Sequence, residues 1–249
     1  MKIAENKALW DGTHNWEHAG DEWSASFGGP AMQWYGSLLP RVHRFLPTGT
    51  VLEIACGFGR WTQFLRDRCN RLYAIDLAQA CVDASSQRFA SDRHVTCHLT
   101  DGKSLAMVPD KSVDFVFSFD SLVHADASVL EAYISQLPRI LKKNGAAFIH
   151  HSNLGAYDRI SLRLLGLVDE FRMRDPDVSS GKVEGYAVAA GMRCISQELH
   201  TWGTRWTLLD CMTTLVMPGN PLARENRKLR NRGLVRESDY LEMLAKLYS

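Results

Sequence analysis

The sequence predicts an α/β fold in which helices cover both faces of a mostly parallel, doubly wound sheet. Short apolar runs, bounded by glycine, proline or a charged residue, alternate with segments of helical periodicity. The expected strands are 51–55, 72–76, 95–99, 113–119 and 146–150, and the expected helices between them are 59–68, 78–90 and 128–141. Strands that alternate with helices at this spacing form right-handed βαβ units, whose strands lie parallel in one sheet.

The length of 249 residues fits a single domain, and two segments depart from the alternating pattern. Residues 1–46 hold four tryptophans and are expected to form an N-terminal helical cap. Residues 152–182 carry mixed charge, and we expect an inserted lid there, with a plain connecting helix as the alternative. A helix over 183–191 and strands over 192–201 and 206–217 are expected to complete the domain.

The composition argues against several classes of protein. Basic residues number 29 and acidic residues 28, so the net charge of +1 indicates no nucleic acid partner. No apolar run reaches the roughly 18–20 residues that span a bilayer, and residues 1–7 lack the apolar core of a secretion signal. The six cysteines form no Cys-x-x-Cys pair, which argues against a zinc site. We therefore expect reduced thiols in a cytoplasmic protein.

The feature that decides the function is Glu53-Ile54-Ala55-Cys56-Gly57-Phe58-Gly59-Arg60, where a strand leads through a glycine loop into a helix. Open α/β sheets bind ligands at the carboxyl ends of their strands. Glycines let backbone N–H groups approach a ligand closely, and a helix N-terminus favours negative charge. A ligand site is therefore expected at this loop.

Three details, at Thr62, Glu53 and Asp101, separate this segment from a dinucleotide-binding fingerprint, and Asp76 adds a further acid to the expected site. The third glycine of that fingerprint is replaced by Thr62. Glu53 lies just ahead of the loop, where a carboxylate suits a ligand with an ammonium group and a sulfonium better than a pyrophosphate. Asp76 ends the second strand, where it can accept hydrogen bonds from ribose hydroxyls, although it is also a candidate N-cap for the next helix. Asp101 follows the third strand, where it can accept from an adenine amino group.

Four motifs occur in a familiar order: 51–60, Ala74-Ile75-Asp76, Thr100-Asp101-Gly102 and 137–145. On these motifs, residues 51–151 resemble a class I S-adenosylmethionine-dependent methyltransferase of Rossmann-like fold. The resemblance implies a seven-stranded sheet with one antiparallel strand and S-adenosylmethionine as cofactor. It also implies that the glycine loop faces the methionine part of the cofactor and Phe119 the reacting methyl group. The expected cofactor-binding residues are Glu53, Ala55, Gly57, Gly59, Asp76, Leu77, Asp101, Gly102 and Phe119.

Histidines after two strands are the candidate catalytic groups. Asp120 and His124 follow the fourth strand at i, i+4 spacing, which would place them on one face of a helix. His150 and His151 end the fifth strand and point to opposite faces, so only one of them can serve the site. The expected catalytic set is Asp120, His124 and His151. A purely structural histidine is one alternative, and a shared divalent ion such as magnesium is another, although no dedicated metal site is assigned.

The expected acceptor is a hydroxyl of a small molecule, namely a sugar or glycan. The segment 194–211 weakly resembles methyltransferases encoded with bacterial polysaccharide-building enzymes. Trp16 and Trp23 either pack within the cap or line the acceptor pocket. The alternatives are N-methylation of a small amine or protein and a non-catalytic cofactor-binding subunit. The basic run 224–232 is either a solvated face or a contact for a phosphate-bearing acceptor or an anionic surface.

Overall fold

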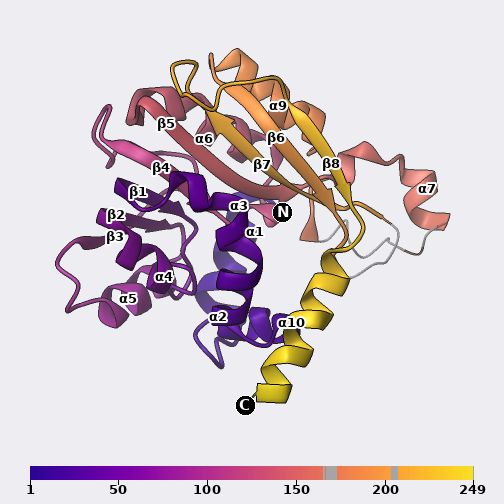
Figure 1. Cartoon of the computed structure of the whole chain (residues 1–249), viewed down its shortest axis with the longest axis horizontal. Coiled ribbons are helices and arrows are strands. Elements are labelled where there is room, and N and C mark those ends of the chain that lie inside the picture. Colours follow the sequence, from indigo (N-terminus) through magenta and orange to yellow (C-terminus); the bar gives the residue numbers. More distant parts are fainter. Residues whose placement is uncertain (165, 167–172, 203–206, 249) are drawn as a thin grey trace.

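A single eight-stranded sheet organises the chain in a computed structural model that describes residues 1–164, 166, 173–202 and 207–248. The strand order is β3-β2-β1-β4-β5-β7-β6-β8. Figure 1 shows β3 at one edge of this sheet and β8 at the other. The strands are β1 (Thr48–Ile54), β2 (Cys69–Asp76), β3 (Val95–Leu99), β4 (Val113–Ser118), β5 (Leu141–Ser152), β6 (Arg193–His200), β7 (Asp210–Val216) and β8 (Arg227–Asn231).

All strand pairs are parallel except those that involve β7, which runs antiparallel to both β5 and β6. Strand order reverses between β1 and β4, so the carboxyl ends of these two neighbours leave a crevice where ligands bind in open α/β sheets. The predicted α/β class with one antiparallel strand is confirmed.

Helices lie on both faces of the sheet and in the N-terminal cap (residues 1–46). The α-helices of six or more residues are α1 (Ile3–Ala8), α5 (Gln79–Arg88), α6 (Ala127–Ile140), α7 (Arg159–Leu164), α9 (Ser180–Ala189) and α10 (Leu234–Tyr248). The other helical segments are η1 (Leu9–Thr13), η2 (Asp21–Phe27), α2 (Pro30–Gln33), η3 (Trp34–Leu38), α3 (Leu39–Val42), η4 (His43–Phe45), α4 (Thr62–Leu65), η5 (Arg66–Arg68), η6 (Leu122–His124) and η7 (Leu154–Ala156). In Figure 1, α7 projects to the side, away from the sheet.

The first core lies between the sheet and helices α6 and α9. The apolar residues of α6 recur at helical spacing and pack against Leu52, Ile54 and Ile75 from the strands. Asp126 caps α6 by accepting a hydrogen bond from the Val129 amide at 3.1 Å, which satisfies one of the free donors at the helix start.

The second core lies between the opposite face of the sheet and the later part of the cap. Trp34 and Leu38, both fully buried, pack against Phe115 and Phe117 of β4. Trp34 stacks on Phe64 with ring centroids 5.4 Å apart, which joins the cap to the first helical segment after β1. This face of the sheet also carries Glu53, which lies two residues after the buried Val51 on β1.

The sheet has eight strands, so the predicted number of seven was wrong by one. The extra strand, β8, comes from the basic run 224–232 and pairs in parallel with β6. Exposed charged residues hide the period-two apolar pattern by which a strand is recognised, so β8 could not be predicted from local patterning.

One helix boundary and one whole helix also differ from the prediction. The helix expected to run to residue 141 ends at Ile140, and β5 starts directly at Leu141. Residues 142–145, predicted as a helix stop, lie in a register shift between β4 and β5. The helix α10 was not predicted.

The remaining expectations concern thiols, membranes and the segment 152–182. All six cysteines are free thiols. No helix among the described residues has both the length and the apolar character needed to cross a bilayer. The segment 152–182 contains η7, α7 and the first residues of α9, and residues 165 and 167–172 of the expected lid lie outside the described residues.

We expect Gly28→Ala to destabilise the fold by about 1–3 kcal/mol through overpacking. A Cβ at Gly28 would lie 2.5 Å from the Cβ of Ala245 and 3.3 Å from the backbone of Glu242, and the φ of +80° disfavours any side chain there. Urea unfolding measures the change. Gly185→Ala in α9 is the matched control, because nothing lies within 4 Å of its added Cβ. That variant should be neutral or more stable by about 0.5–1 kcal/mol. Equal stability of the two variants would contradict close docking of α10.

Candidate functional site

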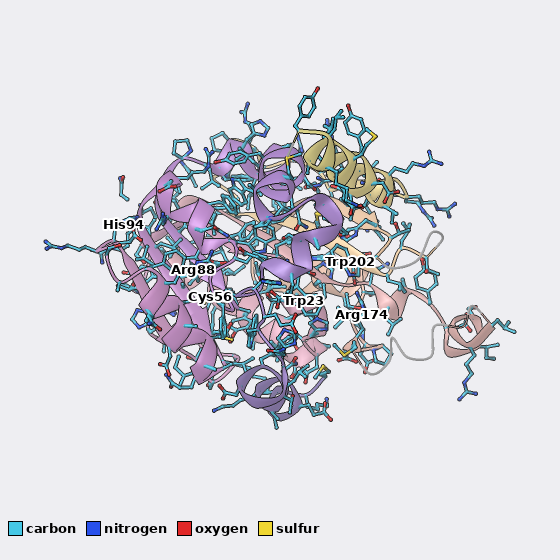
Figure 2. All side chains as sticks on the ribbon, turned by 90° about the horizontal axis from the view of Figure 1, so that it is seen from below. Trp23, Cys56, Arg88, His94, Arg174 and Trp202 are labelled. Atoms are coloured by element: carbon cyan, nitrogen blue, oxygen red, sulfur yellow. The ribbon has the colours of Figure 1, made fainter. Side chains whose placement is uncertain are left out.

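A cavity of about 340 Å³ opens at the carboxyl ends of the central strands. Its walls come from the N-terminal cap, the loops after β1, β2 and β4, and residues near 173 and 202. The volume falls within the range of small-molecule sites. Figure 2 shows Trp23 and Cys56 near the centre of the molecule, with Arg174 and Trp202 beside them. Of the predicted site residues, the lining includes Ala55, Gly57, Asp76, Leu77, Gly102, Asp120 and His124.

The loop after β1 turns its backbone toward the cavity. Ala55 and Gly57 both have positive φ angles, of +59° and +56°. Such a conformation is uncommon for a residue with a side chain, so Ala55 marks a local constraint at this wall. A Cβ added at Gly57 would lie 3.4 Å from the indole ring of Trp16, which itself lines the cavity. The loop can therefore present its backbone to a ligand beneath that indole.

Gly59 is placed differently from Gly57. It does not belong to the cavity lining, and a Cβ there would lie 2.4 Å from the ring of Phe89. Its φ of +87° also favours glycine. The requirement for glycine at this position therefore comes from packing between the loop and the residue that ends α5.

Asp76 joins the ends of β1 and β2. Its Oδ2 accepts a hydrogen bond from the Gly57 amide and its Oδ1 accepts one from the Ala78 amide, each at 2.9 Å. Burial raises the pKa of this carboxyl, while the two backbone donors act in the opposite direction. The bond to Ala78, which is itself the N-cap of α5, corresponds in part to the capping role foreseen for Asp76. Asp76 also lines the cavity, so capping of α5 is not the only role open to its carboxyl.

Glu53 lies behind the loop and outside the cavity lining. It is 1% exposed, and its Oε2 accepts a hydrogen bond from the Thr62 hydroxyl at 2.6 Å. Burial raises the pKa of Glu53 to about 8, an effect that the Thr62 hydrogen bond reduces and the nearby Asp76 increases. Thr62, which replaces the third glycine of the dinucleotide-binding fingerprint, is therefore the hydrogen-bond partner of the Glu53 carboxyl.

The far end of the cavity is formed by Leu77, Gly102 and Ile3. A Cβ at Gly102 would lie 3.4 Å from the side chain of Ile3, so helix α1 covers this glycine. Asp101 is exposed, lies outside the lining, and accepts hydrogen bonds from the amides of Lys103 and Ser104. Those bonds lower the pKa of its carboxyl and form a local turn.

Asp120 lies at the end of β4 and pairs with Arg60. The Arg60 Nη2 donates to Asp120 Oδ2 at 2.8 Å, and both side chains are almost completely buried. The Asp120 amide donates to His150 Nδ1 at 3.1 Å, and its φ is +63°. The prediction that Asp120 and His124 share one helix face was wrong, because a left-handed residue cannot continue into η6.

His124 faces the cavity from the end of η6. Its Nδ1 lies 3.0 Å from the backbone oxygen of Met173, which can only accept, so Nδ1 carries the proton and Nε2 is unprotonated in the neutral ring. Burial lowers the pKa of His124, and the bond to Met173 opposes this effect. The ring of Trp10 lies 5.7 Å away, between centroids.

His151 and Phe119 lie outside the cavity lining. Both ring nitrogens of His151 have partners, since Nδ1 bonds to the Ser152 oxygen and Nε2 to the Thr213 hydroxyl. Phe119 is buried and stacks on His150 with centroids 4.6 Å apart. These two side chains therefore support the strand ends from behind the cavity.

Aromatic rings of the cap form one wall of the cavity. Trp10, Trp16 and Trp23 all belong to the lining, and His14 stacks on Trp23 at 5.4 Å between centroids. Trp16 also stacks on Phe58 of the loop at 4.3 Å. The cap tryptophans therefore pack against one another and also line the cavity.

Sequence reasoning missed Arg60, Arg174 and Trp202 as wall residues. Arg60 is the last residue of the glycine motif, and this position was the one sequence signal that could have identified it as a wall residue. Arg174 pairs through Nε and Nη2 with both oxygens of the buried Asp210 at 2.8 Å, a contact between segments that no local pattern foretells. Within the described residues, no group of three or more His, Cys, Asp or Glu side chains is arranged to hold a metal ion.

This arrangement suits a ligand that is partly apolar and partly charged. The lining combines the backbone of a constrained loop and the Asp76 carboxyl with the His124 imidazole, the Arg60–Asp120 pair and aromatic rings. A reactant held between them would be shielded from water on several sides.

Comparison with known proteins finds similarity over the same region. Residues 51–145 match the model of a methyltransferase domain. The biotin biosynthesis bifunctional protein BioHC of Cellvibrio japonicus is 31% identical over 147 residues, which is 59% of this chain and 28% of that protein. Malonyl-[acyl-carrier protein] O-methyltransferase of Serratia marcescens is 32% identical over 99 residues, covering 40% of this chain and 36% of that protein.

A third relative is phosphoethanolamine N-methyltransferase 1 of Triticum aestivum, with 29% identity over 119 residues, 45% of this chain and 24% of that protein. The chain therefore spans about a quarter to a third of the length of the curated relatives it matches. Among solved structures, a geranyl diphosphate methyltransferase superposes with a TM-score of 0.64 at 11% identity, over 86% of this chain and 98% of that one. At that identity the likeness concerns the fold.

We expect the stability contributed by Glu53 to fall as the pH rises. The folded pKa of about 8 lies above the ordinary glutamate value of 4.5, so between these pH values the folded state holds a proton that the unfolded chain has lost, and the stability decreases as the pH rises. Urea unfolding of wild type and Glu53→Gln from pH 5 to 8.5 measures this. The wild type should lose stability relative to the variant by up to about 1.4 kcal/mol per pH unit. Parallel curves would contradict a protonated Glu53.

Proposed function

We propose that the chain is a class I S-adenosylmethionine-dependent methyltransferase, in keeping with the match of residues 51–145 to a methyltransferase domain, and that it transfers a methyl group to a hydroxyl of a small sugar or sugar-bearing acceptor. The observation that carries the proposal is His124, whose unprotonated Nε2 belongs to a side chain on the cavity wall. An alcohol is a poor nucleophile while it keeps its proton, so a hydroxyl acceptor needs such a base.

The residues present fit the cofactor of this family. S-adenosylmethionine supplies a methyl group that is already activated by a positively charged sulfur. Gly57 leaves the loop backbone open beneath Trp16, where a Cβ would fill the space. Asp76 lies at the cavity with acceptor capacity for ribose hydroxyls, because a carboxylate offers about four acceptor sites and the Gly57 and Ala78 amides occupy two of them. We infer that Leu77 and Gly102, under Ile3, hold the adenine.

Glu53 and Gly59 support this site from behind rather than lining it. Glu53 is charged only at the cost of burying a carboxylate, and a nearby ammonium group would lower its pKa. We propose that the negative charge of the ionised Glu53 carboxylate stabilises the amino group of the cofactor. The hydrogen bond from Thr62 orients this carboxylate.

His124 is the proposed general base. The Met173 carbonyl holds the ring in the tautomer with Nε2 unprotonated, and burial keeps the ring neutral near pH 7 by lowering its pKa. Nε2 would then take the hydroxyl proton, while the cofactor would supply the methyl group to the acceptor oxygen and leave as S-adenosylhomocysteine, with the carbon–sulfur electron pair kept on sulfur. Asp120, held by Arg60, contributes negative charge near the resulting imidazolium, which favours the protonated form.

The chemistry of the walls supports a sugar acceptor. Trp10, Trp23 and Trp202 offer aromatic faces for the apolar side of a sugar ring. Arg60 and Asp120 offer polar groups for its hydroxyls, and the guanidinium of Arg60 also lies 4.6 Å above the ring of Trp61. A flat wall beside charged hydrogen-bonding groups matches a ring that has both kinds of surface.

A small amine is the second candidate acceptor. Three indoles and a buried carboxylate on one cavity also suit a cation, by cation–π attraction and by charge. One relative is named as an N-methyltransferase and another as an O-methyltransferase, so the family allows both. The base role of His124 favours the hydroxyl, because an amine needs less help to become nucleophilic.

We expect Asp76→Asn to weaken binding of S-adenosylhomocysteine about 5- to 150-fold, equivalent to about 1–3 kcal/mol, because an amide replaces a charged acceptor. Calorimetry on the folded protein measures the affinity. Asp101→Asn is the matched control, since Asp101 bonds to its own turn and lies outside the cavity lining. It should change the affinity less than twofold. Unchanged affinity in Asp76→Asn would remove Asp76 from the cofactor site.

We expect turnover on a sugar acceptor to fall roughly 10²–10⁴-fold in His124→Gln, with S-adenosylhomocysteine affinity unchanged within twofold. A panel of nucleotide sugars, glycosides, phenols and amines, followed by mass spectrometry for one added methylene unit, identifies the acceptor. The kcat of the wild type should have an acid limb below pH 6.5, in keeping with the lowered pKa of His124.

His151→Gln tests whether His151 takes part in catalysis, as predicted for both His124 and His151. The ring of His151 is bonded to Thr213 and lies outside the lining, so turnover per folded molecule should persist while stability falls. Near-normal turnover in folded His124→Gln would exclude His124 as the base. Methylation confined to amines or phenols would exclude the sugar acceptor and leave the methyltransferase domain unaffected.

A further inference from the structure

The segment 224–236 concentrates positive charge on an exposed edge. It holds six basic residues against the single acid Glu225, while the whole chain has a net charge of only +1. The remainder of the chain is therefore net negative. The basic side chains are all exposed, and they are Arg224, Arg227, Lys228, Arg230, Arg232 and Arg236.

Neutral side chains hold this segment on the sheet. The Asn226 amide donates to Gln197 at 3.0 Å and the Asn231 amide donates to Glu198 at 2.7 Å, so each end of β8 is tied to β6. Lys228 pairs with Glu184 at 2.8 Å. The five arginines form no ion pair with any described residue. Their charge is thus not needed to place the strand.

Protection of a free sheet edge accounts for only part of this pattern. One or two charged residues are enough to discourage another strand from pairing. Five unpaired arginines on 13 residues repel one another, and that cost is offset when an anion lies among them. Arginine also presents a planar fork of donors that matches phosphate oxygens.

The carboxyl end of this strand lies at the same edge of the sheet as the cavity. β8 runs parallel to β6, with His200 opposite Asn231, and Trp202 follows β6 by two residues and lines the cavity. Neighbouring strands are about 4.8 Å apart, so Asn231 lies close to the backbone that leads to Trp202. Figure 1 shows β8 beside β6, ending where α10 begins. Arg230 and Arg232 lie on either side of Asn231, the last residue of β8.

We propose that Arg230 and Arg232 bind a phosphate group carried by the acceptor, outside the cavity, while the acceptor hydroxyl lies inside near His124. The inference rests on the proposed function and narrows the acceptor to a phosphate-bearing molecule. Its sugar ring passes Trp202, and its phosphate meets the arginine forks at the end of β8. Phosphate contacts outside the cavity bind the acceptor without obstructing the in-line approach to the methyl group.

The first test titrates sodium pyrophosphate into the full chain with S-adenosylhomocysteine present, by calorimetry. The double variant Arg230→Gln/Arg232→Gln should bind pyrophosphate at least tenfold more weakly than wild type. The control Arg44→Gln/Arg93→Gln removes the same charge from exposed positions outside the basic segment and should change the affinity less than twofold. Equal weakening in both double variants, or none in the first, would overturn the proposal.

The second test compares glucose 1-phosphate with methyl glucoside as competitors of pyrophosphate and as acceptors. The phosphorylated sugar should compete at least tenfold better in wild type, and this preference should vanish in Arg230→Gln/Arg232→Gln. Absence of the preference in wild type would overturn the proposal. Arginine-dependent competition without methylation of any acceptor would support the phosphate site while contradicting the proposed transferase function.

A third experiment distinguishes a soluble phosphate-bearing acceptor from an anionic membrane surface as the ligand of Arg230 and Arg232. Sedimentation with vesicles of phosphatidylglycerol and phosphatidylcholine should show no binding that depends on Arg230 and Arg232 at physiological salt. Vesicle binding that is lost in this double variant, without pyrophosphate binding, would overturn a soluble phosphate-bearing acceptor in favour of an anionic lipid surface.

Discussion

The bond between the Asp76 carboxylate and the Gly57 amide is the interaction on which the rest of the site depends. It joins the end of β2 to the loop after β1, and the second oxygen of Asp76 holds the start of α5 through Ala78. The Gly57 amide donates this bond from a backbone with a positive φ of +56°, a conformation that costs little for glycine. One buried acid therefore sets the path of the loop, the entry of a helix and the floor of the cavity.

Similar bonds between side chain and backbone tie the remaining strand ends together. Ser118 donates to the Ile54 oxygen at 2.9 Å, which joins β4 to β1, and His150 of β5 accepts from the Asp120 amide. Asp120 in turn anchors Arg60, which follows the glycine loop. The carboxyl ends of four neighbouring strands thus form one connected rim, and a rim of this kind keeps reacting groups in place without large motions.

Removal of water sets the electrostatics of this rim. Burial raises the pKa of Glu53 and lowers that of His124, so both groups favour their neutral forms near pH 7. A neutral imidazole accepts a proton, and a neutral acid becomes charged when a cation approaches it. The cap contributes to this environment because Trp10, Trp16 and Trp23 cover the cavity from the side opposite the sheet. The same residues thus provide enclosure, aromatic surface and low polarity.

Local patterns in the sequence were enough to determine the α/β class, the positions of β1 to β7 and the glycine loop. Buried parallel strands are continuous apolar runs, and a positive φ favours glycine, so each leaves a mark within a few residues. Asp76, Gly57 and Gly102 were found in this way, and the structure places all three on the cavity. The strand β8 left no such mark, because exposed arginines replace the apolar alternation.

Only the tertiary structure decided which side chains meet. Arg60 pairs with Asp120 across 60 residues, and Arg174 pairs with Asp210 across 36, distances in sequence at which no periodicity operates. The i, i+4 spacing of Asp120 and His124 suggested a shared helix face, yet the left-handed backbone of Asp120 turns its carboxylate to Arg60 and leaves His124 to Met173. Sequence spacing predicts contacts only within regular elements, and catalytic groups on loops are positioned by the elements that hold those loops.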